Sequence, residues 1–139
     1  VVDDEGLAGI VTKTDLMNFY ASKFQNRWKV SNLMTKDVVT VNENHTITHV
    51  INVMEENNID GVVVMFDGEI AGIKRKAREI SMLTAGDIMN EDFVKISPDE
   101  DAVKAAKLMY NSEISHIPVV KDDNLVGIIT KTDIIKGIQ

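Results

Sequence analysis

Two stretches of the chain carry apolar residues at the spacing of a helix. In each stretch these residues recur every three or four positions, which places them on one helix face. The pattern predicts helices over residues 46–57 and 101–112. Just before the second helix, Ser97-Pro98-Asp99-Glu100 has the signals of a helix start, with Ser97 as N-cap, Pro98 at the first helical position and Glu100 closing a capping box. The positions of the two faces, most of them apolar, are Ile47, Thr48, Ile51, Met54 and Glu55, and Ala102, Val103, Ala106, Met109 and Tyr110.

Two short runs of β-branched residues follow the second helix. Residues 116–120 and 125–130 are rich in Val and Ile, and the polar residues 121–124 separate them. Such runs, joined by a polar turn, are typical of paired β-strands. The second run leads directly into another predicted helix.

The same order of elements occurs more than once, because the sequence repeats itself with an offset of 55 residues. Residues 33–41 match residues 88–96, and residues 64–73 match residues 119–128. Residues 1–10 are a further copy of residues 119–128. We therefore divide the chain into the C-terminal part of one repeat (residues 1–29) and two further repeats (residues 30–86 and 87–139). Each repeat is expected to fold as strand, helix, strand, strand, helix, an α/β unit that buries its apolar face against a neighbouring copy.

The middle repeat departs from this pattern after Ile73. Gly72-Ile73 is followed by the basic run 74–78, so that Arg78 stands where the other copies have Asp15 and Asp133. From this point to the next repeat, the middle copy is also eight positions shorter than the first copy. Either the protein has lost the end of this strand, or a stretch between Ile73 and Lys74 is absent from the sequence. In the second case the two residues would lie too far apart for one peptide bond.

Composition limits the partners of the chain. It has 139 residues, 44% of them hydrophobic, which is enough for one core or two small ones. Its formal net charge of -7 provides no overall positive field for nucleic acid or an anionic membrane. The absence of cysteine is typical of a reducing compartment, so we expect a cytoplasmic protein. No stretch is long and apolar enough to span a membrane, and the N-terminus lacks the layout of a signal peptide.

The sequence does not indicate catalysis. It has no Ser/His/Asp or Cys/His set at credible spacing, and no carboxylate pair suited to hold Mg²⁺ beside a phosphate. His45 and His49 lie beside a predicted helix start with polar neighbours, which does not favour a metal site. We predict a chain that is not an enzyme, binds no metal and requires no cofactor.

Three strings within the repeats are similar to those of a known family. In their order and spacing they resemble the CBS (cystathionine beta-synthase) domain, and two such repeats together resemble the pair called a Bateman module. The resemblance covers essentially the whole chain and implies tandem β-α-β-β-α repeats packed as a pair. The strings are Leu33-Met34-Thr35, Ser115-His116-Ile117-Pro118-Val119-Val120, and Gly127-Ile128-Ile129-Thr130-Lys131-Thr132-Asp133, which recurs as Gly9-Ile10-Val11-Thr12-Lys13-Thr14-Asp15.

The resemblance also implies a regulatory ligand, namely AMP, ADP, ATP or a related adenosine compound such as S-adenosylmethionine, in a cleft between paired repeats. A Gly in the strand allows close approach of a ligand, a Thr and free N–H groups at a helix start suit a phosphate, and an Asp suits two ribose hydroxyls. The residues implied are Thr130 and Asp133 for phosphate and ribose, His116 and Lys131 as donors to phosphate with Ser115 beside them, Thr40, Ile59 and Asp60 around the adenine, and Thr12 and Asp15 as the same motif in the first copy.

Alternatives remain open at this point. Thr-x-x-Asp after a strand is also a plain capping box, with Thr as N-cap and Asp reaching back, so helix capping alone can explain residues 12–15 and 130–133. The chain could equally be a ligand-free dimerisation module, or the regulatory insert of a larger enzyme. In each case we expect a homodimer or an intramolecular pair, with the helices 46–57 and 101–112 near the pairing surface. A regulated partner domain or protein is expected with it.

Overall fold

The pairing of the β-strands follows the 55-residue repeat. In the C-terminal copy, β3 (His116–Lys121) pairs antiparallel with β4 (Asn124–Thr130), as the two β-branched runs predict, and Ile96 bridges β3 in parallel at Val119. In the middle copy, β1 (Thr40–Asn42) pairs in parallel with β2 (Val63–Met65), with Val41 opposite Val64. Val41 and Val64 precede Ile96 and Val119 by 55 positions each. The sequence repeat is therefore a repeat of backbone pairing.

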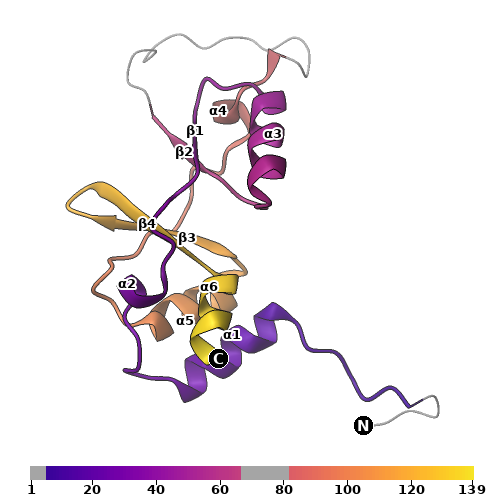
Figure 1. The fold of residues 1–139 in the computed structure, drawn as a ribbon, viewed down its shortest axis with the longest axis vertical. Helices are drawn as coiled ribbons and strands as arrows, with labels where there is room; N and C mark the ends of the chain where they lie inside the picture. The colour runs from indigo at the N-terminus through magenta and orange to yellow at the C-terminus, as the bar shows by residue number, and fades with distance from the viewer. Residues whose placement is uncertain (1–5, 67–81) are drawn as a thin grey trace. The chain divides into compact units, whose positions relative to one another are not determined.

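The computed structural model describes residues 6–66 and 82–139, which fall into two compact units (Figure 1). Unit 1 combines the two ends of the chain, residues 1–36 and 94–139, and unit 2 is the continuous stretch 37–93. The junction between Ile73 and Lys74, at which the repeat breaks, lies outside the described residues. The expectation about that junction stays a prediction.

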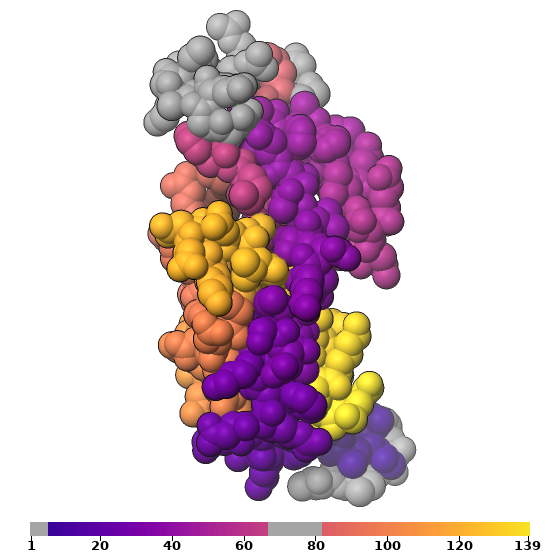
Figure 2. Space-filling view, turned by 60° about the vertical axis from the view of Figure 1, so that its left-hand side comes forward, coloured from indigo at the N-terminus to yellow at the C-terminus, as the bar shows by residue number. Residues whose placement is uncertain are grey.

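Four helices and the β3–β4 pair build unit 1. The helix α1 (Lys13–Lys23) packs on α5 (Ala102–Ser112) and on α6 (Lys131–Ile138), and α2 (Val30–Leu33) also lies against α6. In Figure 2, indigo and purple atoms of the N-terminal segment lie against orange and yellow atoms of the C-terminal one. The apolar face of α5 is thus covered by a helix from another repeat of the same chain. The largest side chains of this core are Met17, Tyr20, Met109, Ile117, Ile129 and Ile134.

The predicted helix over residues 101–112 is confirmed, but the predicted start signal before it is wrong. Asp101 is the N-cap of α5, since its side chain accepts the Val103 N–H at 2.9 Å. Residues 97–100 form a turn instead, in which the Glu100 N–H donates to the Ser97 carbonyl at 3.2 Å. The carbonyl of Glu100 meanwhile accepts the N–H of Val30 at 2.8 Å. A distant segment thus uses backbone groups that a helix starting at Ser97 would need.

The segment after α1 is built into unit 1 by backbone hydrogen bonds to the C-terminal copy. Trp28 accepts the Ala102 N–H through its carbonyl at 2.8 Å, and Ser31 donates its N–H to Pro98 at 3.0 Å. Thr35 exchanges two hydrogen bonds with Ile128 of β4, at 2.8 and 2.9 Å. Residues 28–35 therefore act as an added edge of the C-terminal repeat.

Gly127 allows this segment to cross β4. A Cβ atom at Gly127 would lie 2.7 Å from Met34 Sδ and 2.9 Å from the Thr35 carbonyl oxygen. The close approach that the sequence assigned to a ligand is thus made by the chain itself. At Gly9, the equivalent position of the first copy, nothing lies within 4 Å of such a Cβ.

Unit 2 is smaller and repeats the first half of the motif. Its helix α3 (Ile47–Asn57) begins after the N-cap Thr46, which confirms the helix predicted over residues 46–57. A short helix, α4 (Ala85–Ile88), follows a bridge between Thr84 and Thr46. Among the residues of this unit that the structure describes, the buried side chains are Val41, Val50 and Ala85.

We predict that Gly127→Ala destabilises the protein by about 1–3 kcal/mol, because the added methyl group overlaps Met34 and the Thr35 carbonyl. Urea unfolding followed by circular dichroism measures the change. Gly9→Ala is the matched control, with the same substitution in the same motif, and its unfolding midpoint should stay near that of the unchanged protein. Equal effects of both substitutions would contradict the crossing at Gly127.

Candidate functional site

The two Thr-Lys-Thr-Asp strings both begin helices of unit 1. Thr130 caps α6, where its Oγ1 accepts the Asp133 N–H at 3.2 Å and its own N–H donates to Asp133 Oδ2 at 3.1 Å. Thr12 caps α1 in the same way, with distances of 3.3 and 2.8 Å to Asp15. The capping box is therefore present at both strings. It fixes the local backbone and leaves open what else these side chains bind.

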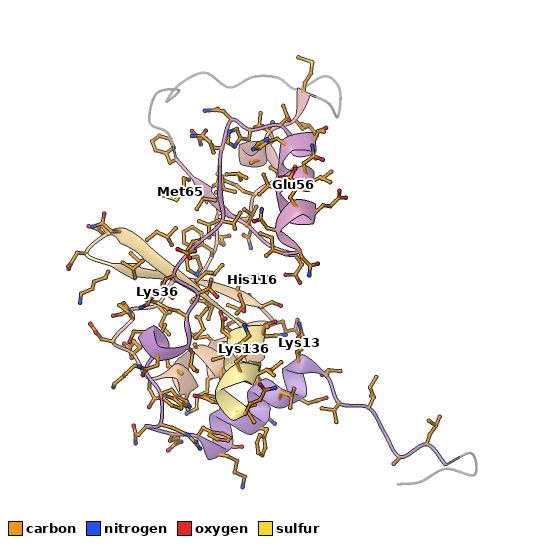
Figure 3. The ribbon with its side chains drawn as sticks, viewed as in Figure 1. Lys13, Lys36, Glu56, Met65, His116 and Lys136 are labelled. Atoms are coloured by element: carbon orange, nitrogen blue, oxygen red, sulfur yellow. The ribbon has the colours of Figure 1, made fainter. Side chains whose placement is uncertain are left out.

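The starts of α1 and α6 meet through two reciprocal lysine contacts. Lys131 Nζ donates to Thr14 Oγ1 at 2.9 Å, and Lys13 Nζ donates to Thr132 Oγ1 at 3.3 Å. Each lysine thus reaches the first turn of the other helix. Figure 3 shows Lys13 at the start of α1. The two ammonium groups and the two helix N-termini together add positive potential beside the carboxylates of Asp15 and Asp133, which favours an anion there.

Ser115 and His116 belong to the same corner of unit 1. His116 is the first residue of β3 and lies opposite Thr130 in the strand register, while the Ser115 carbonyl accepts the Lys131 N–H at 3.2 Å (Figure 3). Strand pairing therefore brings these two predicted ligand residues beside the start of α6. Seven of the ten predicted ligand residues lie in unit 1, and these are Thr12, Asp15, Ser115, His116, Thr130, Lys131 and Asp133.

The two aspartates of the repeated motif differ in environment. Asp15 is exposed, whereas Asp133 is only 6% exposed. The difference comes from Thr35, whose hydroxyl donates to Asp133 Oδ1 at 3.0 Å and also lies 3.3 Å from Oδ2. The carboxylate of Asp133 is therefore buried, because the segment 28–35 covers it.

Thr35 is the residue that sequence reasoning missed. It belongs to the string Leu33-Met34-Thr35, which helped to identify the family but received no part in the site. Its contact with Asp133 joins residues 98 positions apart in the chain, so no local pattern predicts it.

Hydrogen bonds also perturb Asp15. The backbone N–H and then the hydroxyl of Thr12 stabilise its ionised form and hold the pKa of this carboxyl below its ordinary value. Desolvation by burial opposes this shift and is the smallest of the three causes, because Asp15 is exposed. Asp15 is therefore an anionic cap at the start of α1.

The remaining predicted ligand residues lie in unit 2. Thr40 is the exposed first residue of β1. Ile59 follows α3, where its N–H donates to the Met54 carbonyl at 3.0 Å, and Asp60 is exposed. A part for these three residues in ligand binding stays a prediction.

Candidate metal ligands do not cluster in residues 6–66 and 82–139, where no three His, Cys, Asp or Glu side chains lie close enough to hold one ion. The rings of His45 and His49 are tilted by 52° with centroids 4.2 Å apart, but His45 Nδ1 already accepts the Asn42 N–H at 3.0 Å. Across the same residues, no helix combines the length and the apolar character that a bilayer requires.

Comparison with known families gives one match. The CBS domain pattern matches residues 1–22, 30–73 and 85–139. The middle match ends at residue 73, where the repeat breaks. Together the three ranges include most of the chain.

Two proteins of Methanocaldococcus jannaschii illustrate the similarity. The protein MJ1404 is 33% identical over 99% of this chain and 39% of its own length. An inosine-5'-monophosphate dehydrogenase is 33% identical over 94% of this chain and 28% of its own length. The chain thus spans less than half of either relative. The alignment with MJ1404 runs over 163 positions, more than the 139 residues here, so that relative carries residues with no counterpart in this chain.

A solved structure has the same fold over nearly the whole chain. It is that of the protein MJ1225 from Methanocaldococcus jannaschii, described as a candidate archaeal homolog of g-AMPK. The TM-score is 0.81 at 22% identity, and the likeness extends over 99% of this chain and 58% of MJ1225.

We predict that Asp133→Ala lowers the free energy of unfolding by about 2–4 kcal/mol, since it removes a buried acceptor of several hydrogen bonds. Asp15→Ala deletes the same capping box at an exposed position and should have a smaller effect. Urea unfolding of both variants gives the comparison. If Asp15→Ala proves as costly as Asp133→Ala, the contact with Thr35 adds nothing to stability.

A second prediction concerns pH. Because the folded-state pKa of Asp15 is lowered, its capping bond stabilises α1 above the ordinary carboxyl pKa and is lost as the pH falls through the lowered one. NMR titration of the Asp15 carboxyl carbon should show this depressed midpoint. Thr12→Val keeps the backbone donor and loses the hydroxyl, so it should raise the midpoint only part of the way. An ordinary midpoint in the unchanged protein would rule out the bond to Thr12.

Proposed function

Since this chain belongs to the CBS domain family, we propose that it is a ligand-sensing module that binds an adenosine compound beside the start of α6 and transmits its occupancy to a partner domain or protein. CBS domains are regulatory modules, and some are carried by enzymes. The single observation that carries the proposal is the cluster in unit 1 of a buried carboxylate, Asp133, with two lysines and two helix starts. AMP, ADP, ATP and S-adenosylmethionine are the candidate ligands, and no cofactor is required.

Asp133 is suited to the ribose. A carboxylate can accept hydrogen bonds from two neighbouring hydroxyls, and such charge-assisted bonds contribute about 1.5–3 kcal/mol each. Its position is fixed by the bonds to Thr130, so little conformational entropy is lost when a ligand binds. Asp15 offers the same chemistry at the start of α1 without the burial.

The lysines are suited to the phosphate. The chain as a whole is acidic, with a net charge of -7, so a phosphate can be held only where positive charge is concentrated locally. Lys13 and Lys131 provide this at the place where two helix N-termini meet. Their present partners are neutral hydroxyls of Thr132 and Thr14, which a phosphate can replace with a stronger, charged acceptor.

Contacts to the adenine are proposed for Thr40, Ile59 and Asp60 on the family resemblance alone. The carboxylate of Asp60 repels phosphate, so it is assigned to the adenine or ribose. A ligand with one phosphate or none, AMP or S-adenosylmethionine, should therefore bind better than ATP.

The proposal assigns no catalysis to this chain. CBS domain proteins are typically regulatory and non-catalytic. A second candidate role is the regulatory insert of a larger enzyme, which the match to a dehydrogenase of much greater length favours. We place the protein in the cytoplasm because it contains no cysteine.

Assembly as a homodimer is also proposed. The face of α5 that was expected to form a pairing surface is covered by α1 within unit 1, which supports the intramolecular pair. On α3, Ile51 is 48% exposed and offers apolar surface to a second copy. The module would then report ligand occupancy through the dimer or through a partner domain.

Calorimetry with AMP, ADP, ATP and S-adenosylmethionine tests the proposal. We expect AMP or S-adenosylmethionine to bind most tightly, and Asp133→Asn to weaken binding by at least about 10-fold through the loss of a charged acceptor. Asp87→Asn is the matched control, because Asp87 closes the same capping box with Thr84 in unit 2 and is outside the proposed site. It should bind like the unchanged protein.

Contrary outcomes separate the alternatives. If none of the four compounds binds or raises the melting temperature, the ligand-free dimerisation module is the better description. If ATP binds most tightly, the placement of Asp60 is wrong. If Asp133→Asn binds as well as Asp87→Asn, the ribose is not at Asp133.

A further inference from the structure

Asp133 carries the one buried charge among the polar side chains that the structure describes, and its two oxygens have different partners. Oδ2 accepts the backbone N–H and the hydroxyl of Thr130, both at 3.1 Å, and so belongs to the helix cap. Oδ1 accepts the hydroxyl of Thr35 at 3.0 Å. Thr35 lies farther from Oδ2, at 3.3 Å, and a single hydroxyl hydrogen serves one acceptor well at a time.

A ribose at Asp133 must therefore compete with Thr35. Oδ2 already accepts two hydrogen bonds from the cap, so two neighbouring hydroxyls must both bind Oδ1, which has two acceptor positions, one of them used by Thr35. The position on Oδ1 becomes free when the Thr35 hydroxyl turns away. Thr35 and the diol thus bind the same oxygen.

The backbone of Thr35 connects Asp133 Oδ1 to the segment through which the chain leaves unit 1. Its N–H and carbonyl are paired with Ile128, and the preceding residue, Met34, packs where Gly127 has no side chain. Unit 1 ends at Lys36, the next residue, and unit 2 begins at Asp37. Whatever loosens Thr35 therefore loosens the point at which the chain leaves unit 1.

We propose that Thr35 is an occupancy-sensing residue: its hydroxyl holds Asp133 Oδ1 when the site is empty, and a vicinal diol releases it. This inference rests on the proposed function, because it requires a ribose at Asp133. Release of the Thr35 hydroxyl weakens the backbone pairing of Thr35 with Ile128. Ligand binding is thereby transmitted to residues 36 and 37, where unit 1 ends and unit 2 begins. Thr35 is a positioning residue that sets affinity by competition, and the ligand does not need to contact it.

Calorimetry of Thr35→Val with AMP tests the competition. Valine has the same shape without the hydroxyl, so binding should be about 5- to 10-fold tighter than in the unchanged protein, as expected for one competing hydrogen bond removed. Thr35→Ser keeps the hydroxyl and should restore ordinary affinity. Thr48→Val makes the same change at an exposed position on α3 and should leave affinity unchanged.

Hydrogen exchange of the unchanged protein provides a readout that needs no variant. Saturating AMP should accelerate exchange of the amides of Thr35 and Ile128, whose hydrogen bonds join the crossing segment to β4. The amide of Val120, which donates to Ile96 on the other side of β3, serves as the internal control and should not accelerate. A plain stabilising ligand would slow all three.

The outcomes decide both questions separately. Tighter binding of AMP by Thr35→Val and faster exchange of the Thr35 and Ile128 amides support the inference. Binding of AMP by Thr35→Val when the unchanged protein binds none also supports it. If the unchanged protein binds AMP while Thr35→Val binds equally or more weakly, or if the two amides slow with AMP, the competition is overturned and the proposed function stands. If neither protein binds any of the adenosine compounds, the proposed function fails and the inference fails with it.

Discussion

The buried carboxylate of Asp133 is the interaction on which unit 1 depends. Removal of a carboxylate from water is costly unless its oxygens find donors, and here the donors come from the end of β4 and from residue 35. One side chain therefore fixes the start of α6, the end of a strand and a crossing segment relative to one another. The same constraint makes the site chemically specific, because a group that binds Asp133 must offer hydroxyls as good as those that it displaces.

The repeated motif shows how one string takes two roles. At residues 12–15 it is an exposed helix cap, and at residues 130–133 it is a cap that also holds the segment 28–35 through Thr35. Local geometry is nearly the same in both, since each Thr and Asp make the same reciprocal bonds. The difference lies in packing, because segment 28–35 covers only the second copy. A motif of this kind thus specifies backbone geometry, and its surroundings decide whether it has a further function.

Sequence reasoning reached the parts of this structure that repeat or that follow from periodicity. The 55-residue offset matched Val41 and Val64 to Ile96 and Val119, which the structure pairs in the same way, and the apolar spacing located α3 and α5. It failed where long-range contacts decide. The helix starts after Asp101 and not at Ser97, because the N–H of Val30 binds the Glu100 carbonyl. The contact of Thr35 with Asp133 and the reciprocal lysine contacts join distant residues, so no local sequence pattern predicts them. The division into three repeats and the adenine contacts remain proposals.

The order of the two units along the chain has a consequence for how the protein folds. Unit 1 is discontinuous, so its core cannot close before residues 37–93 have been synthesised and the loop that they form has been closed, at an entropic cost that grows slowly with loop length. Unit 2 is continuous, and its contacts become available earlier during synthesis. Until α5 emerges, the face of α1 that carries Met17 and Tyr20 has no partner from the C-terminal segment, which makes the nascent chain most exposed to aggregation during this interval.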